Sequence, residues 1–162
     1  CGGSISEKKS IEVGNIFDQG TKYSEALGLE FTDESGNKKP VIMGAYGIGL
    51  SRVMATVVEV HNDDRGILWP ENISPYKYHL IVLDDKKEQA DKIYKELGEE
   101  EVLYDDRDDK TPGEKFADAD LIGCPVRLVD SKKTLEKDSL EIKYRSKKEF
   151  ELIKLTEVVR SI

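Results

Sequence analysis

The sequence predicts an α/β (α+β) fold in two parts: the C-terminal part of an antiparallel sheet with one helix, then an α/β domain with a mixed sheet. Strand-like runs alternate with helix-like periodicity in the second half, whereas the first half combines short strands with turn residues. Two prolines bracket polar residues between the halves. We therefore expect a first part over residues 1–68, a linker over 69–76 and a second domain over 77–162.

The first half is expected to begin with strands. Residues 11–17, 29–32 and 40–43 have strand character, and the turn residues 33–37 join the last two into a hairpin. Apolar residues then recur with helical spacing, which predicts a helix packed on one face, at Leu50, Val53, Met54, Val57 and Val58. These few elements bury too little apolar surface to be stable alone, so we expect them to be the end of a larger sheet.

The second half alternates strands and helices. Strands are expected at residues 78–83, 102–104, 126–129 and 140–144. Helices are expected at 86–97, with Gly98 as its stop, at 114–122, and at the C-terminus, where Leu152, Leu155, Thr156 and Val159 recur with helical spacing. This alternation indicates an α/β domain with a mixed sheet.

Composition excludes several classes of protein. With 38% hydrophobic and 36% charged residues, the 162-residue chain is not a disordered tail. A net charge of -8 argues against binding nucleic acid by bulk phosphate attraction, and no apolar run approaches the roughly 20 residues that span a bilayer. Cys1 and Cys124 lie far apart, which predicts neither a disulfide framework nor a metal site and fits the cytoplasm. Because the chain begins without Met, we expect it to be a piece of a longer protein.

One glycine-rich segment carries chemistry, and it lies between an expected strand and the expected helix. It reads Gly44-Ala45-Tyr46-Gly47-Ile48-Gly49-Leu50-Ser51-Arg52. We interpret it as a turn whose glycines let the backbone approach a bulky ligand, while the arginine offers a planar cation to a phosphate or a base. The pattern predicts a nucleotide site, although it is neither the GxGxxG fingerprint nor a P-loop. The alternative is close strand packing beside a surface arginine.

These nine residues resemble motif 3 of the class II aminoacyl-tRNA synthetases, and Ser51 before the arginine is similar to the prolyl-tRNA synthetase family in particular. Further stretches resemble that family in its own order: residues 12–17 and 20–26 its bacterial proline-site segment, and residues 66–70, 105–107 and 113–123 its linker and anticodon-binding domain. The likeness covers almost the whole chain. It implies that residues 1–68 are the C-terminal part of a class II catalytic domain and that residues 77–162 bind an anticodon.

The resemblance implies proline–tRNA ligase activity for the intact protein. In the family, L-proline and ATP give prolyl-adenylate and pyrophosphate, and the prolyl group then passes to tRNA(Pro). Arg52 matches the motif 3 arginine, which stacks on adenine and contacts the outer phosphate, so it would stabilise charge and position rather than transfer a proton. Gly47 and Gly49 would lie under ATP. The family also implies Mg²⁺ with the ATP and a homodimer for the intact enzyme.

Proline would be bound by the segment upstream. Glu12 could accept from its ammonium group, Asn15 could hydrogen-bond a neighbouring polar group, and Gly44 would lie beneath it. Many bacterial relatives carry His at the position of Asn15, and both residue types donate and accept. The alternative for Glu12 is an exposed carboxylate at a strand end.

In the second domain, the family reads guanines of the anticodon. Arg107 is the expected reader because its guanidinium matches the two guanine acceptors, with Asp105 and Asp106 accepting from base amino groups. Phe116 would stack on a splayed base, and Lys115 would contact phosphate. The alternatives are a core position for Phe116 and a solvated surface position for Lys115.

Class II catalysis also needs motifs 1 and 2, and neither is in these residues, so we expect the chain alone to be unable to form prolyl-adenylate. Three other interpretations remain open at this point. The chain could be a free-standing tRNA-binding adaptor or synthetase-like paralog, or part of a sibling class II synthetase for glycine, threonine or histidine. A generic ATP-binding enzyme would rest only on the glycine-rich segment.

Overall fold

The computed structural model describes residues 2–83 and 87–161, and the chain divides into two compact units, Cys1–Thr56 and Val57–Ile162. Both are α/β, and the second contains the expected mixed sheet. Among the described residues, no helix has the length and apolar character needed to cross a bilayer.

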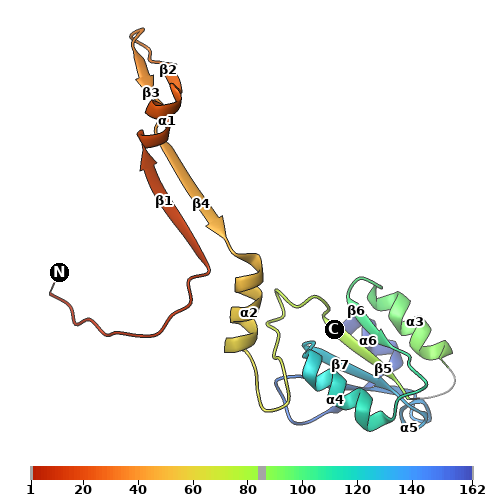
Figure 1. Cartoon of the computed structure of the whole chain (residues 1–162). Helices are drawn as coiled ribbons and strands as arrows, with labels where there is room; N and C mark the ends of the chain where they lie inside the picture. Colours follow the sequence, from red (N-terminus) through yellow and green to blue (C-terminus); the bar gives the residue numbers. More distant parts are fainter. Residues whose placement is uncertain (1, 84–86, 162) are drawn as a thin grey trace. The chain divides into compact units, whose positions relative to one another are not determined.

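Unit 1 is built on an antiparallel ribbon of two strands, β1 (Gly14–Gly20) and β4 (Met43–Ile48) (Figure 1). Between them come helix α1 (Lys22–Leu27) and a hairpin of β2 (Glu30–Thr32) and β3 (Lys38–Pro40). Helix α2 (Leu50–Val60) follows and crosses into unit 2. The hairpin and the helix are confirmed, but the second strand of the hairpin lies at Lys38–Pro40 instead of 40–43, and the first strand of the unit lies at Gly14–Gly20 instead of 11–17. The prediction of a turn at the glycine-rich segment is wrong, because Gly44 and Gly47 pair with β1 and lie in a strand.

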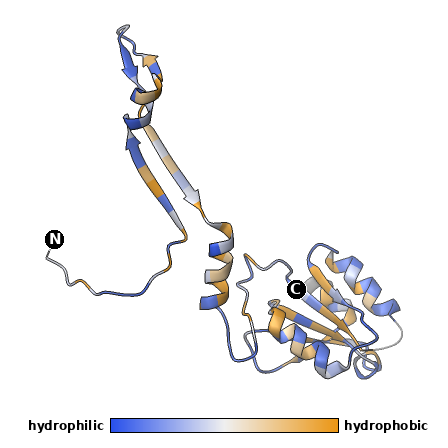
Figure 2. Cartoon of the chain, viewed as in Figure 1, coloured by the Kyte–Doolittle hydropathy of each residue, from blue (hydrophilic) through white to orange (hydrophobic). Residues whose placement is uncertain are grey.

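Unit 1 has almost no interior. Within residues 2–56, Ser24 is the one residue that is buried, whereas Tyr46 of β4 is 87% exposed. None of the described residues of α2 is buried, so the packed face expected for this helix is not formed within the chain. Figure 2 shows apolar residues in orange along β1 and on α2. The ribbon therefore leaves its apolar side chains exposed to solvent. This is what we expect of the end of a larger sheet.

Unit 2 contains a five-stranded mixed sheet in the order β6-β5-β7-β8-β9. The central strand β5 (Tyr78–Val82) pairs in parallel with β6 (Val102–Asp105) and β7 (Val126–Asp130). Strands β8 (Ser139–Tyr144) and β9 (Glu151–Lys154) continue the sheet in antiparallel pairing. The expected strands are confirmed to within two residues, and β9 was not expected.

Besides the end of α2, the described residues of unit 2 form helices α3 (Glu88–Leu97), α4 (Pro112–Ile122), α5 (Lys132–Leu135) and α6 (Leu155–Ser161). Gly98 ends α3 as expected, whereas the start expected at residue 86 lies outside the described residues. Leu152 was expected in the last helix, but it lies in β9 because residues 151–154 pair with β8. The four-residue helix α5 was also missed.

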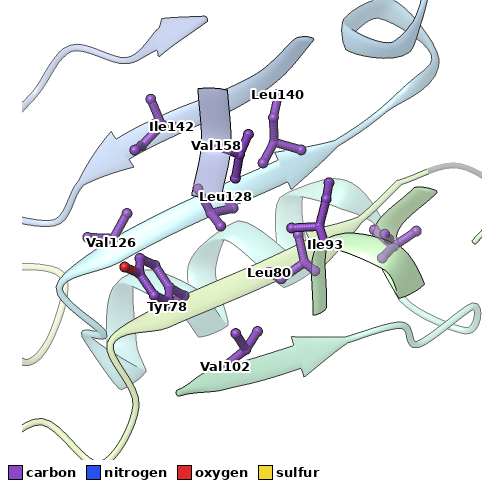
Figure 3. Close-up of a cluster of buried hydrophobic side chains, with 11 residues drawn as sticks. Tyr78, Leu80, Ile93, Val102, Val126, Leu128, Leu140, Ile142 and Val158 are labelled. Atoms are coloured by element: carbon purple, nitrogen blue, oxygen red, sulfur yellow. The ribbon is translucent and has the colours of Figure 1, made fainter. Parts of the chain in front are cut away.

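The main apolar cluster of unit 2 lies on one face of the sheet, beneath α3 and α6. Leu80, Leu128 and Leu140 are fully buried there, and Ile93 of α3 and Val158 of α6 pack against them (Figure 3). On the other face, the ring of Phe116 in α4 lies 4.6 Å from the guanidinium of Arg127 in β7. Helices thus flank both faces of this sheet, as is typical of parallel strands.

Candidate functional site

The first candidate site lies where β1 and β4 meet the start of α2. Asn15 of β1 is paired with Gly47 of β4, and the backbone N–H of Gly49 donates to the carbonyl of Val13 at 2.9 Å. A Cβ on Gly14 would approach the carbonyl oxygen of Gly47 to 2.9 Å, so the two strands are closely spaced. This pairing brings the predicted proline-site segment beside the predicted nucleotide-site segment.

Three predicted site residues meet at this end of the ribbon. Arg52, in the first turn of α2, donates through Nη1 to the carbonyl oxygen of Glu12 at 2.9 Å, and the same Nη1 lies 4.0 Å from Glu12 Oε1. Asn15 Nδ2 donates to Glu12 Oε1 at 3.2 Å. The side chain of Arg52 remains 60% exposed, so much of its guanidinium is available to a ligand.

The three predicted glycines do not share one surface. Gly47 lies opposite Asn15, but Gly44 lies three residues before Gly47 in β4, opposite Asp18, and is therefore on the other side of the ribbon. A Cβ on Gly47 would have nothing within 4 Å. Within the described part of unit 1, a larger side chain at position 47 would therefore meet no clash, so packing there does not explain the glycine. An open apolar hollow of about 640 Å³ adjoins it, lined in part by Asn15, Tyr46 and Val53.

The second candidate site is a hollow of about 270 Å³ in unit 2, at the carboxyl ends of β5 and β6. These neighbouring parallel strands lead to α3 and α4, and the hollow lies at their carboxyl ends, the edge at which open α/β sheets bind ligands. Four basic and two acidic side chains contribute to its lining, which consists of Val82, Leu83, Lys87, Asp106, Arg107, Asp108, Lys110, Pro112 and Lys115.

The guanidinium of Arg107 is already held by carboxylates. Its Nε and Nη2 donate to Oδ1 and Oδ2 of Asp105, both at 2.8 Å, and Nη2 also donates to Asp118 at 2.8 Å. Asp105 is 5% exposed, and its hydrogen bond from Arg107 keeps the pKa of this carboxyl below its ordinary value. Both oxygens of Asp105 thus accept from Arg107 inside the protein, and the expected contact of Asp105 with base amino groups stays a prediction.

The other predicted residues of this site differ in exposure. Lys115 is 3% exposed, and its Nζ donates to the carbonyl of Val82 at 2.7 Å. This buried position fits neither the alternative of a solvated surface lysine nor the expected contact with phosphate. Asp106 lies at the rim and accepts from Lys87 Nζ at 3.2 Å. Phe116 is half-buried, with Arg127 over its ring. The core alternative fits Phe116 better than a fully open stacking position.

Several residues at the second site were missed. Thr111 and Glu114 form a capping box that starts α4, and the Thr-Pro-Gly-Glu spacing was a sequence signal for it. Asp118, which pairs with Arg107 across 11 residues of sequence, gave no such signal. Within residues 2–83 and 87–161, no group of three or more His, Cys, Asp or Glu side chains is arranged to hold a metal ion.

Acidification is expected to destabilise unit 2 through His79, which lies in β5 and is 2% exposed. Burial lowers its pKa to about 4, with Arg107 and Arg127 acting in the same direction and Asp105 and Asp118 opposing it. Since the unfolded chain takes up this proton near pH 6.5, the stabilisation is complete above that pH and is lost as the pH falls through 4. It amounts to about 3 kcal/mol.

Urea unfolding of the chain and of His79→Gln between pH 4 and pH 7 tests this, with exposed His61→Gln as the matched control. The difference in unfolding free energy between the chain and His79→Gln should change steadily across that range, whereas His61→Gln should follow the unsubstituted chain. Parallel pH profiles for His79→Gln and the unsubstituted chain would contradict the assignment.

Comparison with known families matches both parts of the chain. Residues 74–162 match the family described as "Anticodon binding domain", and residues 4–61 match the "tRNA synthetase class II core domain (G, H, P, S and T)". The first match alone covers more than half of the chain. The two candidate sites therefore lie in two different family domains.

Curated relatives are named proline–tRNA ligases. That of Dehalococcoides mccartyi is 45% identical over 168 residues, which cover 100% of this chain and 29% of the relative. That of Staphylococcus haemolyticus is 46% identical over 93% of this chain and 27% of its own length. That of Moorella thermoacetica is 44% identical over 92% and 27%. The chain thus spans less than a third of the length of these relatives.

Two solved structures share the fold. The prolyl-tRNA synthetase of Cryptosporidium parvum, complexed with L-proline and AMP, matches 92% of this chain and 32% of its own, with a TM-score of 0.82 and 23% identity. The prolyl-tRNA synthetase of Giardia lamblia, in complex with prolyl-adenylate, matches 91% and 33%, with a TM-score of 0.79 and 22% identity.

Proposed function

Because the chain belongs to the class II aminoacyl-tRNA synthetase family through its anticodon-binding domain, we propose that it is the C-terminal part of a proline–tRNA ligase. The observation that carries the proposal is the 44–46% identity to proline–tRNA ligases that runs through both parts in one order. The intact protein would activate L-proline with ATP and transfer the prolyl group to tRNA(Pro). Because the relatives reported above are all proline–tRNA ligases, they favour this family over the sibling synthetases for glycine, threonine or histidine.

At the first site, Arg52 would hold ATP, with the free edges of its guanidinium toward adenine and the outer phosphate. The hydrogen bond from Nη1 to the Glu12 carbonyl fixes one end of this guanidinium. Gly47 would let the backbone lie against the ligand, in keeping with the open space above it, and Gly49 would end the strand beneath ATP. Glu12 and Asn15 would face proline, and Gly44 would contribute from the other side of the ribbon.

At the second site, Arg107 would read a guanine of the anticodon, with Asp106 at the rim. Its bond to half-exposed Asp118 is the one that a guanine acceptor could replace, because exposed ion pairs contribute little. Asp105 would then orient Arg107 through the two hydrogen bonds that it accepts from Nε and Nη2. Phe116, which is half-buried, would contact a splayed base.

Three finer features belong to the same proposal. Mg²⁺ would arrive with ATP and be held chiefly by the phosphate oxygens, because Mg²⁺ prefers oxygen ligands. Among the described residues, Glu12 is the carboxylate that lies beside Arg52 and could add a protein ligand. The intact enzyme would be a homodimer. It would act in the cytoplasm, where tRNA is charged.

Two measurements test the proposal. The chain should bind a stem-loop carrying the proline anticodon more tightly than a scrambled one. A chimera in which it replaces the matching C-terminal part of the Moorella thermoacetica ligase should catalyse proline-dependent ATP–pyrophosphate exchange, whereas the 162-residue chain alone should not. Exchange by the chain alone, or a folded chimera without activity, would overturn the proposal.

A second candidate is a free-standing tRNA-binding adaptor. It is favoured by one observation: unit 2 has a complete core, whereas the described part of unit 1 has almost none. Anticodon binding by the chain together with an inactive chimera would favour the adaptor.

A further inference from the structure

The C-terminal end of α4 is capped by a segment from elsewhere in unit 2. The last carbonyl groups of a helix have no partner within it. In α4, the carbonyl of Asp120 accepts from Arg145 Nε at 3.0 Å and that of Leu121 from the backbone N–H of Ile67 at 3.2 Å. The carbonyls of Ile122 and Gly123 both accept from Trp69, the first from the indole Nε1 at 3.0 Å and the second from the backbone N–H at 3.3 Å.

We call residues 61–69, which directly follow α2, the strap. The strap and the end of α4 meet backbone to backbone. A Cβ on Gly123 would lie 2.0 Å from the carbonyl oxygen of Ile67, and one on Gly66 would lie 2.4 Å from Leu121 Cα. Neither position admits a side chain, so both glycines are required by this contact.

A half-buried ion pair holds the strap in place. Asp63 accepts from Arg145 Nη1 and Nη2, both at 2.7 Å, and from the backbone N–H groups of Arg65 and Gly66 at 2.9 and 3.0 Å. Arg145 is otherwise inaccessible, with 5% of its side chain exposed. Since its Nε holds Asp120 of α4, one guanidinium joins the strap to the helix.

The same helix carries the candidate RNA site toward its other end. Asp118 pairs with Arg107, and Asp120 pairs with Arg65 of the strap at 3.1 Å and with Arg127 at 3.5 Å. Arg127 in turn lies over the ring of Phe116. Contacts therefore run without a gap from the strap along α4 to the residues proposed to face the anticodon.

We propose that the strap is part of the tRNA-binding body, and that Asp63, Trp69 and Arg145 are positioning residues that hold α4, and through it Arg107 and Phe116, in the geometry that recognises the anticodon. This inference rests on the proposed function. Most of the strap lies between the two family matches, which end at residue 61 and begin at residue 74.

The test uses the full 162-residue chain with Asp63→Asn, Trp69→Phe and the matched control Asp64→Asn, which alters the exposed neighbour of Asp63. Three quantities are measured: hydrogen exchange of the strap amides, fluorescence of Trp69, which is the single tryptophan of the chain, and affinity for the proline and scrambled stem-loops. The ratio of the two affinities reports recognition rather than global stability.

Asp63→Asn should speed exchange of the Ile67 and Trp69 amides at least about tenfold and shift Trp69 emission to the red, because Arg145 loses its charged partner. Its preference for the proline stem-loop should fall about five- to tenfold, and that of Trp69→Phe about threefold, while Asp64→Asn changes neither quantity. Should Asp63→Asn fail to fold, Trp69→Phe, which removes one N–H donor, decides alone.

Faster exchange with an unchanged preference would make the strap a purely structural cap and overturn the inference. Unchanged exchange in Asp63→Asn would overturn the clamp itself. Equal binding of both stem-loops by the unsubstituted chain would instead remove the proposed function, and that result needs no variant.

Discussion

Replacing Arg52 by alanine in the active chimera should lower kcat/KM for proline-dependent ATP–pyrophosphate exchange by about 10²- to 10³-fold. The guanidinium is anchored by one nitrogen to Glu12 and otherwise exposed, so alanine removes both a flat surface for adenine and a charge for the outer phosphate. Arg52→Lys keeps the charge but loses the planar fork, and it should recover only a small part of the rate. Initial rates at varied ATP and varied proline check both variants.

Lys38→Ala is the matched control, because Lys38 is an exposed cation of the same unit with only a long contact of 3.8 Å to Glu30. It should leave exchange unchanged. Activity of Arg52→Ala within about threefold of the chimera would contradict a role in holding ATP, since one lost charged contact is worth more than that.

Local periodicity predicted much of the fold. The apolar spacing from Leu50 gave a helix that the structure places at Leu50–Val60, and Gly98 ends α3 where a glycine stop was expected. These features depend on residues that are neighbours in the sequence, so a local sequence pattern is enough to predict them.

Features that depend on distant partners were not predicted. Leu152, Leu155 and Val159 fit a helix by spacing, but pairing of residues 151–154 with β8 outweighs that local preference. The glycine-rich segment looked like a turn because glycine weakens strands, yet pairing with β1 makes most of it a strand. A local sequence pattern does not show which strand a segment will pair with.

The candidate sites divide in the same way. The glycine-rich pattern selected Arg52, and the family resemblance added Glu12 and Asn15; the three residues lie together. Sequence reasoning failed for Lys115, because lysines are usually exposed, whereas this one is buried against the carbonyl of Val82, 33 residues away. The carboxylates around Arg107 also come from two different elements. The sequence therefore indicated candidate residues that lie close together, but not which of their charges face one another.

Asp105→Asn should destabilise unit 2 by about 3 to 5 kcal/mol, the largest stability effect expected here. The carboxylate is nearly inaccessible and accepts from Arg107 Nε and Nη2, and its Oδ1 lies 3.9 Å from Nζ of buried Lys115. The amide is isosteric but neutral, so two cations lose their shared counter-charge. Urea unfolding at neutral pH, followed by far-ultraviolet circular dichroism, measures the change.

The neighbouring residue supplies the control. Asp106 is 53% exposed and pairs with Lys87 at 3.2 Å, so Asp106→Asn should cost less than about 1 kcal/mol. Asp105→Asn should also bind the proline and scrambled stem-loops with similar affinity at temperatures where it is folded, because Arg107 loses the fork that orients it while phosphate contacts persist. Equal destabilisation by the two substitutions would mean that Asp105 is not the shared counter-ion. Retained discrimination by folded Asp105→Asn would mean that Arg107 reads the anticodon without it.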